Sequence, residues 1–271
     1  MSRRFLAAAV QFCAASDKAA NRATAARLAR GAAERGASLI VLPEMFAWRG
    51  PREAEADAAE DVPGPTSEWL AALARELNVV LVGGSLLERS ARADRYHNTC
   101  TVYGRDGALL GRYRKVHLFD VDLPGHVTHR ESDTKLRGDA VVTVPTELAT
   151  LGLSICYDLR FPELYRRLMA AGATVVCLPS AFTFPTGAHH WEILVRARAI
   201  EDQVYVVAAN QIGRSPSGVN DYGHSLIVDP WGTPIARASN GETAIVAEID
   251  LDYLDRVRRE LPCLEHRTFG D

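Results

Sequence analysis

Residues 151–163 read Leu-Gly-Leu-Ser-Ile-Cys-Tyr-Asp-Leu-Arg-Phe-Pro-Glu, an apolar run that ends at Cys156 directly before a predicted turn into a helix. Pro162 suits a first helical position and Gly172 suits the position after a last turn, so the pattern predicts a helix over residues 162–171. A strand that ends at a sharp turn lifts its last side chain to the rim of the sheet. The N-terminus of the following helix carries partial positive charge, which favours thiolate over thiol. This position is therefore typical of a nucleophile.

A purely structural interpretation of Cys156 competes with the catalytic one. Free cysteine is among the most buried residue types, and it usually packs as a small hydrophobic side chain. Position alone does not decide between the two interpretations, so other reactive groups must be found.

Two further segments place reactive side chains at strand ends. Residues 39–44 read Leu-Ile-Val-Leu-Pro-Glu, which predicts a strand that ends just before Glu44. Lys115 lies in an aromatic and aliphatic setting just after the strand-like residues 109–112. Taken singly, both are equally typical of solvated surface groups. Because the carboxyl ends of strands in open α/β sheets form the rim on which sites are built, we expect both to converge with Cys156.

With these three motifs in order, the sequence resembles the nitrilase superfamily of carbon–nitrogen hydrolases over nearly its whole length. Residues 191–201 and the segments Tyr-Gly-His-Ser (222–225) and Asp-Pro-Trp-Gly (229–232) are similar to the branch that contains deaminated glutathione amidase and omega-amidase. The resemblance implies that Glu44, Lys115 and Cys156 form a Glu-Lys-Cys triad that needs no cofactor. It also implies a second carboxylate between the lysine and the cysteine. Glu131 is the candidate, and the nearby alternatives are Asp120, Asp122 and Asp133.

The chemistry of amide hydrolysis explains why these residue types are needed. An amide carbonyl is a poor electrophile, so the reaction requires a strong nucleophile, a base and a positive group where oxyanion charge develops. Cys156 is expected to attack the carbonyl carbon while Glu44 takes the thiol proton and passes it to the departing nitrogen. Lys115 and the backbone N–H of Tyr157 are expected to hold the oxyanion. Water activated by Glu44 then hydrolyses the thioester on Cys156.

Substrate-binding residues are predicted around the nucleophile. Arg160 follows Cys156 by four residues, and its guanidinium suits a substrate carboxylate in bidentate fashion. A salt bridge from Arg160 to Asp158 or Glu163 is the competing interpretation. His190 lies near the start of a predicted helix and is expected at the mouth of the site. The expected substrate-binding residues are Tyr157, Arg160, Phe182 and His190.

Composition and motif content exclude several classes of function. The five cysteines show no Cys-x-x-Cys spacing, so no metal site is expected. Neither phosphate-binding glycine motif is present, and a formal net charge of −3 gives no basic footprint for nucleic acid. No apolar run approaches the length that spans a membrane. Unpaired cysteine spacing and a thiol nucleophile favour the reducing cytoplasm.

Apolar periodicity predicts helices and strands that alternate along the chain. Besides the strand before Cys156, strands are expected at residues 5–13, 38–42, 79–83, 98–103, 140–144, 174–178, 204–209, 225–228 and 244–249. Helices are expected at residues 17–35, 66–77, 162–171, 188–202 and 251–260. Two sheets, each covered by helices, form the natural packing of such an α/β chain, and a single carbon-nitrogen hydrolase domain over residues 1–271 is expected. The resemblance implies a four-layer αββα sandwich that assembles into a homodimer or homotetramer.

The sequence thus predicts a cysteine-dependent amidohydrolase that cleaves a small carboxylate-bearing amide, such as deaminated glutathione or an omega-amide of a dicarboxylic acid. Hydrolysis of N-carbamoyl amino acids or of nitriles is the alternative within the same class. True nitrile hydrolysis is disfavoured, because Tyr157 and Asp158 follow Cys156 where nitrilases carry Trp-Glu. A non-catalytic ligand-binding protein of the same fold is the alternative from another class.

Overall fold

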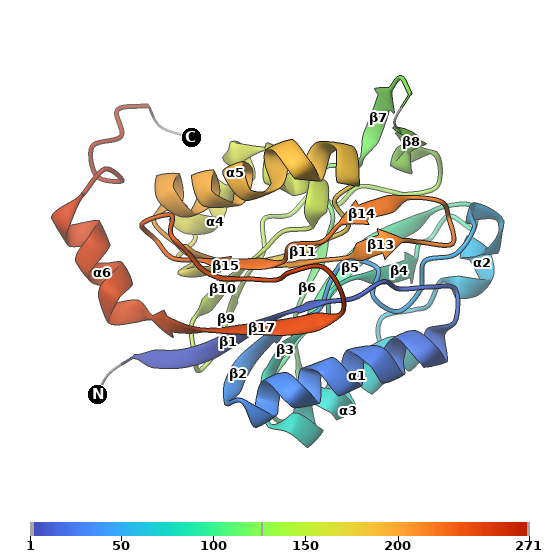
Figure 1. Ribbon diagram of the computed structural model, residues 1–271, viewed down its shortest axis with the longest axis horizontal. Helices are drawn as coiled ribbons and strands as arrows, with labels where there is room; N and C mark the ends of the chain where they lie inside the picture. The colour runs from blue at the N-terminus through green and yellow to red at the C-terminus, as the bar shows by residue number, and fades with distance from the viewer. Residues whose placement is uncertain (1–2, 126, 270–271) are drawn as a thin grey trace.

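Two β-sheets lie face to face and carry helices on their outer sides in the computed structural model, which describes residues 3–125 and 127–269 (Figure 1). The first sheet has the order β17-β1-β2-β3-β5-β4, with β6 paired to β5. Its strands are β1 (Arg4–Gln11), β2 (Ala37–Val41), β3 (Val80–Val82), β4 (Leu86–Arg89), β5 (Tyr96–Tyr103), β6 (Leu109–Arg114) and β17 (Thr243–Asp250). The second sheet has the order β16-β15-β12-β11-β10-β9. Its strands are β9 (Thr143–Pro145), β10 (Thr150–Leu153), β11 (Val175–Ser180), β12 (Tyr205–Asn210), β15 (Leu226–Val228) and β16 (Pro234–Arg237).

The helices form the two outer layers of the sandwich. Figure 1 shows α1 and α3 on one side of the paired sheets and α4 and α5 on the other, with α6 at one end. The helices are α1 (Lys18–Glu34), α2 (Glu55–Ala58), α3 (Pro65–Leu77), α4 (Pro162–Ala170), α5 (Phe184–Asp202) and α6 (Leu251–Glu260), and the short 3-10 turns are η1 (Arg52–Ala54), η2 (Glu131–Asp133) and η3 (Cys156–Arg160). Two hairpins, β7 (Asp120–Leu123) with β8 (Val127–Arg130) and β13 (Ile212–Arg214) with β14 (Asn220–Tyr222), lie outside the main sheets. None of the helices within the described residues is long and apolar enough to cross a membrane.

The layered packing follows from strands that bury both faces. Successive side chains of a strand point to opposite faces, and a strand covered on both sides therefore reads as a continuous apolar run. In β1, Ala7 and Ala9 belong to the core between the sheets, whereas Ala8 and Val10 belong to the core beneath α1 and α3. Small alanines on both sides of β1 allow the layers to approach closely.

The four-layer αββα architecture is as the sequence predicts, and the long strands and helices lie close to their expected positions. One expected helix differs, because α5 begins at Phe184 rather than at residue 188, and the short helix α2 was not expected. Pro185 occupies its first turn, where the missing N–H of proline costs nothing, so the helix starts one turn earlier. His190 consequently lies in the second turn of α5. The sequence does not predict the short strands β4, β7, β8, β13, β14 and β16.

Candidate active site

Glu44 is held at the end of β2 by bonds to its backbone. The strand ends at Val41, and the carboxylate that follows three residues later is 4% exposed. Gln211 donates from Nε2 to the backbone oxygen of Glu44 at 2.8 Å. The next residue, Met45, has a left-handed φ of 52° and donates its N–H to Oγ of Ser85 at 2.9 Å. These bonds fix the direction of the Glu44 side chain.

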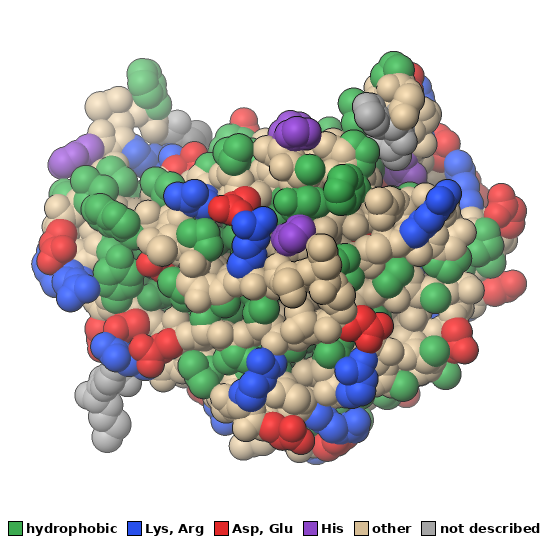
Figure 2. Space-filling model, viewed as in Figure 1, with side chains coloured by type: hydrophobic (Ala, Val, Ile, Leu, Met, Phe, Trp, Pro, Cys, Tyr) green, Lys and Arg blue, Asp and Glu red, His purple; other side chains and the backbone are tan. Residues whose placement is uncertain are grey.

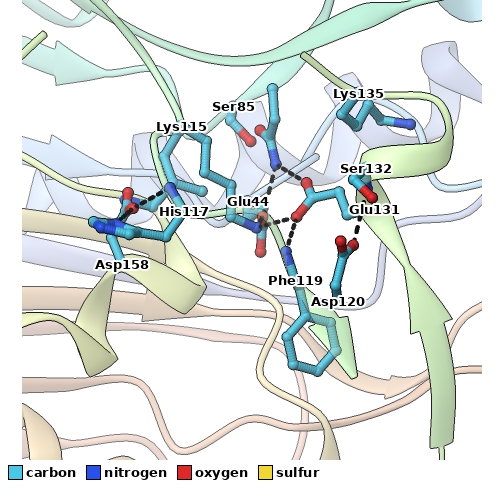
Figure 3. A network of polar contacts seen from close by, with 12 residues as sticks. Glu44, Ser85, Lys115, His117, Phe119, Asp120, Glu131, Ser132, Lys135 and Asp158 are labelled. Carbon is cyan, nitrogen blue, oxygen red and sulfur yellow. Dashed lines mark hydrogen bonds and ion pairs between the residues drawn. The ribbon is translucent and has the colours of Figure 1, made fainter. Parts of the chain in front are cut away.

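Lys115 follows directly on β6 and points between two carboxylates, as Figure 3 shows. Its backbone N–H donates to Asn98 at 2.9 Å, which continues the ladder between β5 and β6. Its Nζ lies 3.0 Å from Oε1 of Glu44 and 2.9 Å from Oε2 of Glu131. The lysine is only 2% exposed, so the two carboxylates take the place of water around its ammonium group.

Glu131 opens the 3-10 turn η2 and is 7% exposed. Its Oε2 accepts a second bond from the backbone N–H of Phe119 at 2.7 Å. Asn98 donates from Nδ2 to Oε1 of Glu44 at 2.8 Å and to Oε1 of Glu131 at 3.3 Å. The amide of Asn98 therefore ties the two carboxylates together, and the sequence analysis missed this residue. Asn98 is buried in β5 like the polar residues His97 and Thr99 beside it, so nothing in the sequence singles it out.

Cys156 opens η3 after the end of β10 and has a φ of 47°, in the left-handed region that few non-glycine residues adopt. Strained backbone of this kind persists only where the surroundings determine it, and it is frequent at functional sites. The thiol is buried at 7% exposure, and it hydrogen-bonds to Glu44 and to the backbone of Ala181. Glu44, Lys115 and Cys156 thus meet at one point, as the strand ends predict, and Glu131 joins them, as the family resemblance implies.

The expectation of a favoured thiolate is wrong for this structure. Burial and the negative charge of Glu44 raise the pKa of the Cys156 thiol well above its ordinary value, and the positive charge of Lys115 opposes them only in part. The helix α4 begins at Pro162, six residues beyond the cysteine, so the field of its N-terminus has faded at the sulfur. The thiol is therefore protonated at rest and must lose its proton to Glu44 during the reaction.

The lysine and Glu131 stay charged because each stabilises the other. Burial lowers the pKa of Lys115, but the negative charges of Glu131 and Glu44 outweigh it and raise the pKa well above the ordinary value. Burial raises the pKa of Glu131, and the charge of Lys115 and the N–H of Phe119 bring it below the ordinary value. The arrangement holds an ammonium group next to the thiol throughout the ordinary pH range.

The four predicted substrate-binding residues also lie together. Nη1 of Arg160 is 3.2 Å from Nδ1 of His190, and the guanidinium lies over the rings of Tyr157 and Phe182 at 5.7 and 5.1 Å from their centroids. Burial and the positive charge of Arg160 lower the pKa of His190, so its imidazole is neutral and can accept from the guanidinium.

The competing interpretation of Arg160 as a partner of Asp158 or Glu163 finds no support in the described part of the chain. There Arg160 forms no ion pair with either residue. The Asp158 carboxylate instead accepts hydrogen bonds from the Tyr113 hydroxyl and from backbone N–H groups. The guanidinium therefore carries a positive charge that no carboxylate neutralises in the ion pairs of the described structure.

Comparisons with known proteins place this arrangement in a family. The family model described as carbon-nitrogen hydrolase matches residues 6–259. The omega-amidase of Mus musculus is 40% identical over 263 residues, which cover 97% of this chain and 95% of that protein. The deaminated glutathione amidase of Bos taurus is 42% identical over 268 residues, which cover 97% of this chain and 81% of that protein.

Solved structures agree with the sequence relatives. The C. elegans NitFhit protein superposes with a TM-score of 0.91 at 38% identity, covering 98% of this chain and 65% of that one. A Saccharomyces cerevisiae protein described as a member of branch 10 of the nitrilase superfamily superposes with a TM-score of 0.88 at 34% identity, covering 98% of this chain and 97% of that one. The chain described here therefore belongs to the carbon-nitrogen hydrolase family within the nitrilase superfamily.

Proposed function

We propose that this carbon–nitrogen hydrolase is an amidase that uses Cys156 as nucleophile, Glu44 as general base and acid, and Lys115 as stabiliser of the oxyanion. The observation that carries the proposal is the contact of Lys115 Nζ with Glu44 at 3.0 Å beside a buried thiol that hydrogen-bonds to the same carboxylate. Nucleophile, base and positive charge are thereby within reach of one small substrate. Such a set suits acyl transfer from nitrogen to sulfur and then to water.

The reaction begins with transfer of the thiol proton to Glu44 as the sulfur of Cys156 attacks the amide carbonyl carbon. The carbonyl π electrons move to the oxygen, whose negative charge is stabilised by the ammonium of Lys115 and by the backbone N–H of Tyr157. When the C–N bond breaks, Glu44 gives its proton to the nitrogen, which leaves as ammonia. Water then attacks the thioester, Glu44 takes its proton, and the carboxylic acid leaves as Cys156 recovers its thiol.

Glu131 acts in this scheme by holding Lys115 charged and in place. With two carboxylates around one ammonium group, Lys115 cannot give up its proton to the substrate, and it serves as a fixed positive charge. A preorganised donor at a developing oxyanion contributes about 3–4 kcal/mol to lowering the barrier. Glu44, which contacts both Lys115 and the thiol, remains the one group that exchanges protons.

We further propose that the substrate is a small amide with a carboxylate at its far end, such as deaminated glutathione or an omega-amide of a dicarboxylic acid. The support is the guanidinium of Arg160, four residues from the nucleophile, over Tyr157 and Phe182 and next to a neutral His190. A carboxylate reaching this group gains charge-assisted hydrogen bonds in a partly desolvated setting. The names of the two relatives reported above are consistent with this substrate class.

The test is release of ammonia from deaminated glutathione, 2-oxoglutaramate, succinamate, N-carbamoyl amino acids and small nitriles by wild type and by Cys156→Ala. Cys177→Ala is the matched control, because Cys177 is equally buried and free but lies within β11. The expected result is release from at least one carboxylate-bearing amide, retained in Cys177→Ala and absent in Cys156→Ala.

Other outcomes identify the alternatives. Carbon dioxide released together with ammonia indicates hydrolysis of a carbamoyl group. Turnover restricted to nitriles indicates a nitrilase. A folded wild-type protein that hydrolyses none of these compounds contradicts the proposal and favours a non-catalytic ligand-binding protein.

We also propose that residues 1–271 act as one carbon-nitrogen hydrolase domain in a cytoplasmic homodimer or homotetramer, without nucleic-acid or membrane partners. The outer face of α5 and the adjoining turn expose Ile193 (68%), Ile200 (47%) and Trp231 (57%), and Figure 2 shows hydrophobic side chains on this side of the molecule between scattered charges. Exposed apolar clusters of this kind mark protein–protein contacts. Sedimentation equilibrium of wild type and Ile193→Glu tests the proposal, with a dimer or tetramer expected for wild type and dissociation expected for the variant. A monomeric wild-type protein would contradict it.

A further inference from the structure

The carboxylate of Asp158 is fully buried two residues beyond Cys156 and takes no part in the proposed reaction. It accepts four hydrogen bonds. Oδ2 accepts from the hydroxyl of Tyr113 at 2.7 Å and from the backbone N–H of Ile155 at 2.8 Å. Oδ1 accepts from the backbone N–H of His117 at 3.0 Å and pairs with its Nδ1 at 2.7 Å. A charged carboxylate is costly to bury and is tolerated only when it is fully hydrogen-bonded, as this one is.

The four donors belong to the two segments that carry the lysine and the cysteine. Tyr113 lies in β6 two residues before Lys115, and His117 lies two residues after Lys115, beyond the end of that strand. Ile155 directly precedes Cys156, in the turn that leaves the second sheet. Figure 3 shows His117 and Asp158 joined beside the Lys115 side chain. One carboxylate therefore connects the backbone on both sides of Lys115 to the backbone beside Cys156.

Two further features make this connection rigid. The ring of His117 stacks on Phe161 with centroids 3.7 Å apart and planes within 6°, so its Nδ1 is held towards Asp158. Cys156 itself has the left-handed φ of 47°, a conformation that neighbouring bonds must maintain. The bond from Ile155 to Asp158 closes the turn around the cysteine, and the bonds from Tyr113 and His117 anchor that turn to the opposite sheet.

We propose that Asp158, through Tyr113 and His117, is a positioning residue that sets the distance between the Cys156 thiol and the Lys115 ammonium across the two sheets. This inference rests on the proposed function of Cys156 and Lys115, and it assigns their alignment to the hydrogen bonds of Asp158. A displacement of about 1 Å at a reacting group costs up to about 100-fold in rate. Loosening this connection should therefore reduce turnover more than substrate binding.

The test uses Tyr113→Phe, His117→Ala and His117→Asn, with Tyr165→Phe as the matched control. Tyr165 is also fully buried and donates its hydroxyl to Ser154 at 3.0 Å, but it does not contact the Lys115 segment through that bond. For each variant, kcat and KM are measured on the amide that wild type hydrolyses, and the thermal midpoint is recorded. Cys156 is also modified with acrylamide, a small amide-bearing electrophile, and the rate is followed by mass spectrometry.

We expect kcat to fall between about 10- and 100-fold in Tyr113→Phe and His117→Ala, with KM within about twofold. His117→Asn should recover most of the loss, because the side-chain N–H of asparagine can donate from near the Nδ1 position. Tyr165→Phe should lower the thermal midpoint while kcat stays within about twofold. If Tyr113→Phe and His117→Ala change kcat no more than Tyr165→Phe does, the role of Asp158 is structural only.

The acrylamide rates separate failure of this inference from failure of the proposed function. If wild type hydrolyses no amide but its Cys156 reacts faster with acrylamide than the Tyr113→Phe and His117→Ala variants do, the amidase proposal fails and the positioning role stands. Equal acrylamide rates in all four variants and wild type overturn the positioning role whether or not amides are hydrolysed.

Discussion

Replacing Glu131 by Gln removes one of the two negative charges around Lys115 and keeps the size of the side chain. Nζ of Lys115 and Oε2 of Glu131 are 2.9 Å apart, and both side chains are almost fully buried. At an effective dielectric constant of about 20, two unit charges at this distance attract by about 6 kcal/mol. The cost of burying both charges offsets part of that attraction, and removal of one partner of a buried pair costs about 3–5 kcal/mol.

Glu44 still contacts Lys115 in the variant, so the ammonium is not left without a partner. We therefore expect the lower end of the range, a loss of about 3 kcal/mol in the free energy of unfolding. The lysine should also shift towards Glu44, away from the developing oxyanion, and loss of such a donor reduces kcat by about 10²- to 10³-fold. The measurements are urea unfolding and the initial rate of ammonia release.

Asp120→Asn is the control for this experiment. It removes one negative charge from the hairpin that leads to Glu131, but Asp120 is exposed and accepts a bond from the backbone N–H of Ser132 at 3.0 Å. This variant should keep wild-type turnover. A Glu131→Gln protein that is as stable as wild type and retains kcat within about threefold would refute the reasoning, because the second carboxylate would then have no part in holding the lysine.

Three further predictions concern substrate selection and stability. Arg160→Ala should raise KM for a carboxylate-bearing amide by about 10- to 100-fold, because charge-assisted hydrogen bonds contribute about 1.5–3 kcal/mol. The KM for a neutral amide should stay nearly unchanged. Equal changes in KM for the two substrates would mean that Arg160 has no role in selection. Burial raises the pKa of Asp202 from 3.8 to about 7, so the folded state retains a proton that the unfolded state releases. The free energy of unfolding should therefore fall by up to about 4 kcal/mol as pH rises from about 4 to about 7, and this decline should be absent in urea titrations of Asp202→Asn. Trp191→Phe should lower the free energy of unfolding in urea by about 1–3 kcal/mol, because the part-buried carbonyl of His224 loses the bond that Nε1 of Trp191 donates to it at 2.8 Å. Unchanged stability would mean that water replaces the bond.

The main architecture and the meeting of Glu44, Lys115 and Cys156 were predictable because each rests on a local pattern. Glu44 and Cys156 follow buried strands that read as apolar runs, whereas Lys115 follows the mostly exposed β6 and was placed by the motif around it. The family resemblance added the second carboxylate, Glu131. Its position next to Lys115 depends on the hairpin of β7 and β8 directly before η2, which shows no clear sequence period.

The missed features depend on contacts between segments far apart in the chain. Asn98 bridges Glu44 and Glu131 because of the register between β5 and β6, which the sequence alone does not determine. The short hairpins bury few apolar side chains and show no clear alternation. The expectation that the helix N-terminus favours the Cys156 thiolate was wrong, because it left out the depth of burial and the adjacent charge of Glu44.

The division of the site between the two sheets has a consequence for how the protein is made. Glu44 and Lys115 follow strands of the first sheet, whereas Cys156 follows a strand of the second. The first sheet is itself completed by β17, near the C-terminus, which pairs with β1 along its whole length. A growing chain that has left the ribosome only as far as η3 carries Cys156 before β11, β12 and β15 complete the second sheet and before β17 pairs with β1. We therefore expect the arrangement of Glu44, Lys115 and Cys156 to be complete only once β17 has paired with β1, so that a chain without β17 lacks the assembled site.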